Sequence, residues 1–142
     1  MFSLKRAAAA AVAAACVLGV LALHAASTPQ LERGRYLVER ACTCTHCHSP
    51  MDAKGNPDPA RAMQGAPTMI KSIVKVPAWA ETAPALAGLV GYTDAQIVRA
   101  LTTGIGPAGN PLRPPMPPFR FDKADAEAIA AYLRTLKPAP KR

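Results

Sequence analysis

The chain has 142 residues, enough for one domain, and half of them are hydrophobic. Lys and Arg outnumber Asp and Glu by 17 to 9, which gives a formal net charge of +8. The basic residues are scattered along the chain and form no Lys/Arg run flanked by aromatic residues, so an ordinary solvated surface is at least as good an interpretation as a docking patch. The positive charge favours acidic proteins or anionic lipids as partners.

The N-terminal segment has the pattern of a secretory signal peptide. Lys5 and Arg6 form a basic start, and residues 7–26 carry no charge, are rich in alanine and end in small residues. We therefore predict a signal peptide over 1–26 and one exported, periplasmic domain over 27–142. An apolar run of about 20 residues is also long enough to span a bilayer, so an uncleaved membrane anchor is the alternative. On this basis the protein would associate with a membrane only if the segment is retained.

A first helix is predicted over residues 30–41. Pro29 precedes it, as is common at a helix start. Apolar residues recur on one face of this stretch, and charged residues surround them. The predicted buried face consists of Leu31, Tyr36, Leu37 and Val38.

Two further helices are predicted in the second half of the chain. One covers residues 93–103, with Thr93 as its N-cap and Gly104 as its C-terminal stop. The other covers residues 122–136, with Asp122 as its N-cap. Both carry an apolar stripe at helical spacing, formed by Ile97, Val98 and Leu101 in the first and by Ile129, Tyr132, Leu133 and Leu136 in the second.

The segments between these helices are rich in proline and are predicted to be irregular. They cover residues 50–84 and 106–118, and the sequence predicts one short helical or extended piece around Ile70 to Val76. Apolar residues are too few for a core of the usual size. Long loops in a small domain usually wrap around something, and a bound cofactor would complete the core. The fold class predicted is all-α, with about three main helices.

Cys44-Thr45-His46-Cys47-His48 has the C-x-x-C-H spacing of a c-type haem attachment sequence. Two cysteines three positions apart lie on the same side of one helical turn, so both sulfurs can reach the vinyl groups on one edge of a porphyrin. His48 then directs its imidazole towards the iron. We predict one covalent haem c bound by Cys44, Cys47 and His48.

Cys42 is an additional cysteine next to this motif, and it leaves three alternatives open. With Cys44, Cys47 and a histidine it could form a zinc knuckle, although these ligands are crowded and no second Cys/His pair follows downstream. It could also be a reactive thiol, or serve as an alternative attachment point in a C-x-x-x-x-C-H arrangement. We expect it to be incidental to haem binding.

Methionine is the expected second axial ligand of the iron. Beyond the signal segment the only histidines are His46 and His48, and His46 lies inside the attachment turn. The best candidate is Met116, because the prolines around it stiffen the loop and remove amide donors that would attract water. Met63 and Met69 are the weaker alternatives.

The sequence resembles the class I cytochrome c family over nearly all of residues 27–142. The motifs that carry the resemblance are Gly34-Arg35-Tyr36-Leu37-Val38, Cys44 to Pro50, Leu86-Ala87-Gly88-Leu89, Leu101-Thr102-Thr103-Gly104, Pro114-Pro115-Met116-Pro117 and Ala130-Ala131-Tyr132-Leu133. The resemblance implies a cytochrome c fold, a helix crossing at Gly34 and Tyr132, and a distal ligand at Met116. It also implies, more loosely, that Trp79 lies near the haem.

The resemblance further implies a carrier of single electrons rather than an enzyme. No free distal histidine is available to handle protons, which also argues against a haem enzyme. The expected partners are redox proteins, with a periplasmic dehydrogenase or membrane complex as donor and a protein such as a terminal oxidase as acceptor. The alternatives are a small haem-c subunit of a larger complex, or a redox or gas sensor in which Met116 is displaced.

Overall fold

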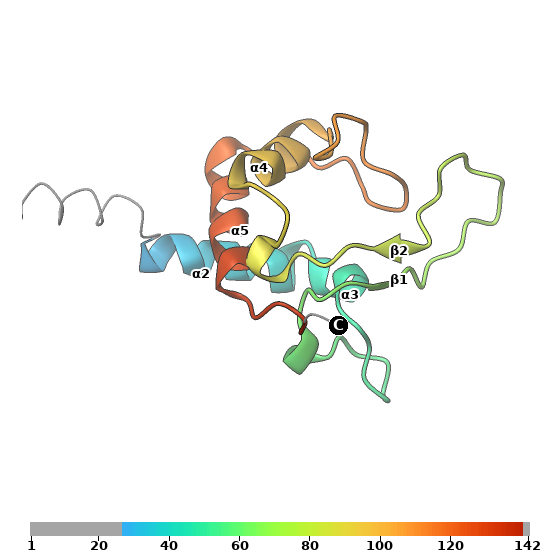
Figure 1. The fold of residues 1–142 in the computed structure, drawn as a ribbon, viewed down its shortest axis with the longest axis horizontal. Helices are drawn as coiled ribbons and strands as arrows, with labels where there is room; N and C mark the ends of the chain where they lie inside the picture. The colour runs from blue at the N-terminus through green and yellow to red at the C-terminus, as the bar shows by residue number, and fades with distance from the viewer. Residues whose placement is uncertain (1–26, 141–142) are drawn as a thin grey trace, which may run out of the picture.

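The computed structural model describes residues 27–140, and these are mostly helical (Figure 1). The predicted signal segment lies outside the described residues. The helices are α2 (Thr28–Tyr36), α3 (Cys44–His48), α4 (Asp94–Thr103) and α5 (Lys123–Thr135). Shorter turns are the π-helical η1 (Leu37–Ala41) and the 3-10 turns η2 (Pro59–Arg61) and η3 (Ala87–Leu89). Two short strands, β1 (Ala66–Pro67) and β2 (Thr82–Ala83), pair in antiparallel fashion.

The first predicted helix is confirmed, but it starts earlier and ends differently. Ser27 caps α2, since its side chain accepts a hydrogen bond from the backbone N–H of Gln30. The helix then widens into η1, where the N–H of Cys42 bonds to the carbonyl oxygen of Leu37 at 2.9 Å. Leu37 and Val38 are buried as predicted, whereas Tyr36 is half exposed and does not belong to the buried face.

The two later helices are confirmed to within one residue at each end. Thr93 and Gln96 form a capping box at the start of α4, and Gly104 ends it in the left-handed conformation with φ 75°. Asp122 caps α5 by accepting from the N–H of Asp125. These boundaries were predictable because side chains close in sequence determine them.

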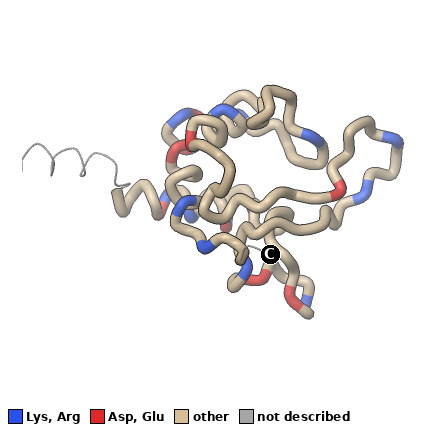
Figure 2. Tube along the Cα trace, in the orientation of Figure 1, with Lys and Arg blue, Asp and Glu red and all other residues tan. Residues whose placement is uncertain are grey.

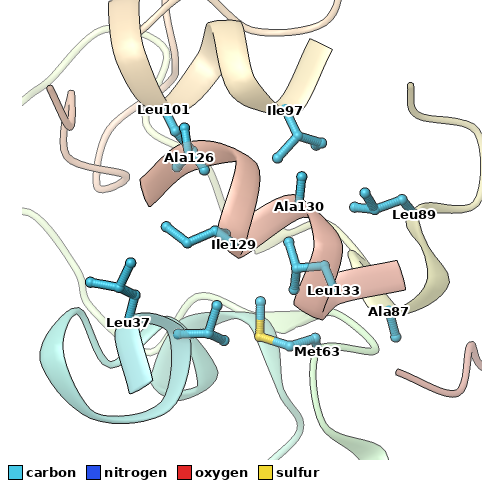
Figure 3. Close-up of a cluster of buried hydrophobic side chains, with 11 residues drawn as sticks. Leu37, Met63, Ala87, Leu89, Ile97, Leu101, Ala126, Ile129, Ala130 and Leu133 are labelled. Atoms are coloured by element: carbon cyan, nitrogen blue, oxygen red, sulfur yellow. The ribbon is translucent and has the colours of Figure 1, made fainter. Parts of the chain in front are cut away.

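The core forms where α2 and α5 cross, with α4 and η3 packed beside α5 (Figure 3). Gly34 lies at the closest approach of α2 and α5. A Cβ atom at this position would lie 2.0 Å from the carbonyl oxygen of Ala128 and 2.8 Å from the Cβ of Tyr132. The helix crossing at Gly34 and Tyr132 is thus confirmed. The core residues around it are Leu37, Val38, Met63, Ala87, Leu89, Ile97, Leu101, Ala126, Ile129, Ala130 and Leu133.

Polar contacts on both sides of the crossing hold α2 and η1 against α5. The guanidinium of Arg33 donates two hydrogen bonds to the carboxylate of Asp125, at 2.8 and 2.7 Å. The hydrogen bond and charge of Arg33 lower the pKa of Asp125 below its usual value. The hydroxyl of Tyr132 donates to the carboxylate of Glu39. These pairs join residues more than 90 positions apart, so they fix the relative orientation of the first and last helices.

Substituting Gly34 with alanine is expected to destabilise the haem-loaded protein by about 1–3 kcal/mol, because the added methyl group overpacks the crossing. Guanidinium unfolding followed by far-UV circular dichroism measures this change. Gly106→Ala is the matched control. The nearest atoms to a Cβ there are 3.4 Å away, so its effect is expected to stay within about 0.5 kcal/mol. Equal stability of the Gly34→Ala and Gly106→Ala variants would contradict the tight crossing.

The long segment between α3 and α4 is irregular as predicted, but it contains a hairpin that the sequence analysis missed. β1 and β2 pair Ala66 with Ala83 and Pro67 with Thr82, and residues 68–81 form the loop between them. The short helical or extended piece predicted around Ile70 to Val76 is wrong. These residues are neither helix nor strand, because they lie in the projecting loop and have no partner strand. No helix within residues 27–140 is long and apolar enough to cross a membrane.

Candidate haem-attachment site

The attachment motif forms the short helix α3, directly after η1. Thr43 separates the two, with a left-handed backbone at φ 48° that turns the chain between them. The N–H of His46 bonds back to the carbonyl oxygen of Thr43 at 3.0 Å, which closes the turn. Cys44 and Cys47 therefore share one helical turn, as the motif predicts. Cys42 lies outside this turn, at the end of η1.

His48 is buried at the end of α3 and makes one specific hydrogen bond. Its Nδ1 lies 2.8 Å from the carbonyl oxygen of Pro84. A carbonyl oxygen can only accept, so Nδ1 carries the proton and Nε2 keeps its lone pair. Burial also lowers the pKa of His48, which favours the neutral imidazole that binds metals. The structure thus holds His48 in the tautomer and charge state of an Nε2 iron ligand.

The cysteines of the site are free thiols with partly exposed side chains. Burial raises the pKa of the Cys44 thiol to about 12, so this sulfur stays protonated at neutral pH. Within residues 27–140 no three His, Cys, Asp or Glu side chains gather in a metal-binding cluster, and this counts against the zinc knuckle.

The chain after α3 fixes the orientation of this helix. The N–H of Gly65 donates to the carbonyl oxygen of His48 at 2.8 Å, and the N–H of Met63 donates to the hydroxyl of the buried Ser49 at 2.9 Å. The side chain of Met63 is buried within the hydrophobic core, next to Leu133 and Ala87 (Figure 3). Its packing there is that of a core residue, whereas Met69 is largely exposed.

Met116 lies in the long loop between α4 and α5. Its side chain is half buried, and its N–H bonds to the carbonyl oxygen of Arg113 at 3.1 Å in a tight turn. In the view of Figure 1 this loop and α3 lie on either side of the extended segment that contains β2. Met116 therefore belongs to a separate loop, and the structure gathers only Cys44, Cys47 and His48 on one element.

Residues 78–84, which we call the strap, make hydrogen bonds both to the loop that contains Met116 and to His48 on α3. At one end of the strap, Arg113 donates to the carbonyl oxygens of Ala78 and Trp79 at 3.0 and 3.1 Å. The N–H of Ala80 donates to the carbonyl oxygen of Pro114 at 2.6 Å. At the other end, Pro84 accepts the hydrogen bond from His48. One short segment thus contacts both the loop of Met116 and the imidazole of His48.

Sequence reasoning missed the strap. Trp79 was expected near the haem, and the structure places it within the strap, with its indole N–H donating to the carbonyl oxygen of Ile70 at 3.2 Å. The one signal available for Arg113 was its position directly before Pro114-Pro115-Met116. An arginine in a stiff loop has several donors and needs acceptors, but the sequence does not say where these acceptors lie.

The donor set on α3 fits haem c. It offers two thiols on one helical turn and the neutral imidazole of His48, whose Nε2 keeps its lone pair. These are the groups that covalent haem attachment requires.

The comparison with known families agrees with this site. Residues 31–137 match the family model described as Cytochrome c, which covers most of the chain. The protein belongs to the cytochrome c family. Its cofactor is covalently bound haem c, and its function is haem-based electron transfer. A comparison with curated proteins gives no match.

Proposed function

We propose that this protein is an exported electron carrier with one haem, whose iron His48 and Met116 would ligate. In this assignment Cys44 and Cys47 would tether the haem. The observation that carries the proposal is the hydrogen bond from His48 to Pro84, which holds the imidazole ready on the same turn as both thiols. The pattern of residues 1–26 supports export to the periplasm.

The bound haem supplies a one-electron iron couple. The residues of the chain hold that couple in place and adjust its potential. The thioether of Met116 is a soft ligand that favours ferrous iron, and the prolines on both sides of it lack N–H groups that would bring water close. The hydrogen bond to Pro84 raises the basicity of His48 as a ligand. We expect electrons to pass through the haem edge near Cys47, whose side chain is partly exposed.

The partners follow from this role. We propose that a periplasmic dehydrogenase or membrane complex donates electrons and that an acceptor such as a terminal oxidase receives them. The excess positive charge of the chain supports acidic docking surfaces on these proteins. No observation favours a nucleic-acid partner.

A reduced-minus-oxidised visible spectrum, combined with intact mass and a pyridine haemochrome assay, tests the proposal. We expect one covalent haem per chain and a six-coordinate ferrous spectrum that carbon monoxide leaves unchanged. Mass spectrometry of the N-terminus shows whether residues 1–26 are removed. Rapid carbon monoxide binding by the wild type would instead support a sensor in which Met116 is displaced.

Arg113 is expected to position Met116, because its two hydrogen bonds fix the loop to the strap. The substitution Arg113→Gln removes both hydrogen bonds and lowers the free energy that holds the loop of Met116 against the strap by about 1–2 kcal/mol. The fraction of protein molecules with an open iron site then rises about tenfold. Imidazole titration measures this rise as a tighter apparent affinity of the protein for imidazole. A fall in the midpoint potential is expected alongside.

Arg120→Gln is the matched control for this prediction. Arg120 belongs to the same loop and also donates to backbone carbonyls, those of Pro118 and Phe119, but these bonds stay within its own neighbourhood. Its replacement is expected to leave imidazole affinity unchanged. Equal effects of the two substitutions would show that Arg113 has no special role.

A further inference from the structure

The hairpin loop 68–81 carries most of the exposed large hydrophobic side chains of residues 27–140. Four of the six are Met69, Ile70, Ile73 and Val74, and Ile73 is fully exposed. Figure 1 shows that this hairpin projects from the helical body. The remaining two, Tyr36 and Val90, are single side chains on other elements. The exposed apolar side chains are therefore concentrated on one projecting tip. They do not contribute to the core there, and an exposed apolar patch of this kind marks an interaction site.

The charges on the hairpin are separated along its length. Lys71 and Lys75 alternate with the apolar residues of the tip, and Glu81 lies at the base beside β2. Figure 2 shows the corresponding blue segments on the hairpin and a red segment at its base. No acidic residue lies between positions 68 and 80. The tip is thus both apolar and positively charged.

Hydrogen bonds hold the base of the loop in place. Trp79 bridges its two sides by donating to the carbonyl oxygen of Ile70, and Arg113 binds the carbonyl oxygens of Ala78 and Trp79. Thr68 donates its N–H to the carbonyl oxygen of Glu81 at 2.7 Å. The tip is therefore presented on a fixed support, and little ordering is needed when it binds a surface.

We propose that the tip of this hairpin binds the surface of an anionic lipid bilayer. The aliphatic side chains would enter the boundary between headgroups and acyl chains, while the ammonium groups of Lys71 and Lys75 would stay at the lipid phosphates. A stable protein interface uses roughly 20–30 residues a side, many more than this tip offers. A bilayer needs only a few apolar side chains with adjacent positive charge. The proposed contact uses no residue of segment 1–26. It therefore differs from the expectation from sequence, in which the protein meets a membrane only if that segment is retained.

Vesicle co-sedimentation of the haem-loaded protein tests the proposal, with the N-terminus of the sample defined by intact mass. We expect binding to vesicles of equal parts phosphatidylglycerol and phosphatidylcholine, much weaker binding to phosphatidylcholine alone, and loss of binding as salt increases. Ile73→Ser is expected to weaken binding about tenfold. Val90→Ser is its matched control, since Val90 is also largely exposed but lies outside the hairpin, and it should bind like the wild type.

The lysines are tested in the same assay. Lys71→Gln/Lys75→Gln is expected to weaken binding to the anionic vesicles by about tenfold or more. Lys54→Gln/Lys137→Gln removes the same charge from exposed positions elsewhere and should have a small effect. Equal losses in both double variants, or unchanged binding of Ile73→Ser, would overturn the proposal in favour of general attraction to a basic protein.

One further outcome is informative. If the wild type ignores anionic vesicles but Ile73→Ser slows electron transfer to a protein partner, the hairpin is a protein-docking surface and the lipid proposal is wrong. The visible spectrum of each variant is recorded in parallel. It reports on haem attachment independently of vesicle binding, so failure here is distinguishable from failure of the proposed electron-carrier function.

Discussion

The double variant Cys44→Ser/Cys47→Ser is expected to lose covalent haem completely. Both thiols lie on the single turn of α3, and a serine hydroxyl cannot form the thioether. The described core is small and rich in alanine, so loss of the cofactor should also reduce folded protein sharply. Intact mass after acid–acetone extraction measures the covalent haem, and the yield of soluble chain measures folding.

Cys42→Ser provides the matched control within the same cluster. Cys42 ends η1 on the other side of the left-handed Thr43, outside the turn that holds the attachment thiols. Its replacement should leave one covalent haem and an unchanged spectrum. Loss of haem in Cys42→Ser, with haem retained in Cys44→Ser, would show that the chain uses the longer cysteine spacing instead.

Met116→Ala is expected to open the sixth coordination position while leaving the haem attached. If the wild-type site is open less than about 1% of the time, the variant should bind imidazole about 100-fold more tightly and acquire carbon monoxide binding. Loss of the soft thioether should also lower the midpoint potential. Imidazole titration and a spectroelectrochemical titration measure the two effects.

The other methionines distinguish ligand loss from general damage. Met69→Ala removes an exposed side chain and should change neither spectrum nor potential. Met63→Ala removes a side chain buried in the core and should destabilise the protein by about 2–5 kcal/mol while leaving a six-coordinate spectrum. An open site in Met63→Ala but not in Met116→Ala would transfer the ligand role to Met63.

The helices were predictable because local patterns determine them. The side chains of Thr93 and Asp122 cap their helices by accepting hydrogen bonds from backbone N–H groups three residues further along the chain. Gly104 ends α4 at a backbone angle that glycine adopts easily. The attachment turn was equally predictable, since Cys44, Cys47 and His48 are close in sequence. For all these features the information lies within a few residues of the feature itself.

The hairpin and the strap were not predictable for the opposite reason. β1 and β2 have two residues each, too few for an alternating pattern, and they exist because of their pairing with each other. The contacts of Arg113 with Ala78 and Trp79, and of His48 with Pro84, join side chains to distant backbone carbonyls. Every residue has such a carbonyl, so no residue type at positions 78–84 indicates these bonds.

The strap also limits how this sequence can change in length. Its two ends are fixed by Arg113 and His48, so an inserted or deleted residue between positions 78 and 84 would shift one attachment relative to the other. Residues 70–77 are not held at both ends in this way, and the hydrogen bond from Trp79 to the carbonyl oxygen of Ile70 is the contact that ties them to the strap. Homologous chains should therefore vary in length at the hairpin tip and keep a constant number of residues between the tryptophan and the proline that follows it.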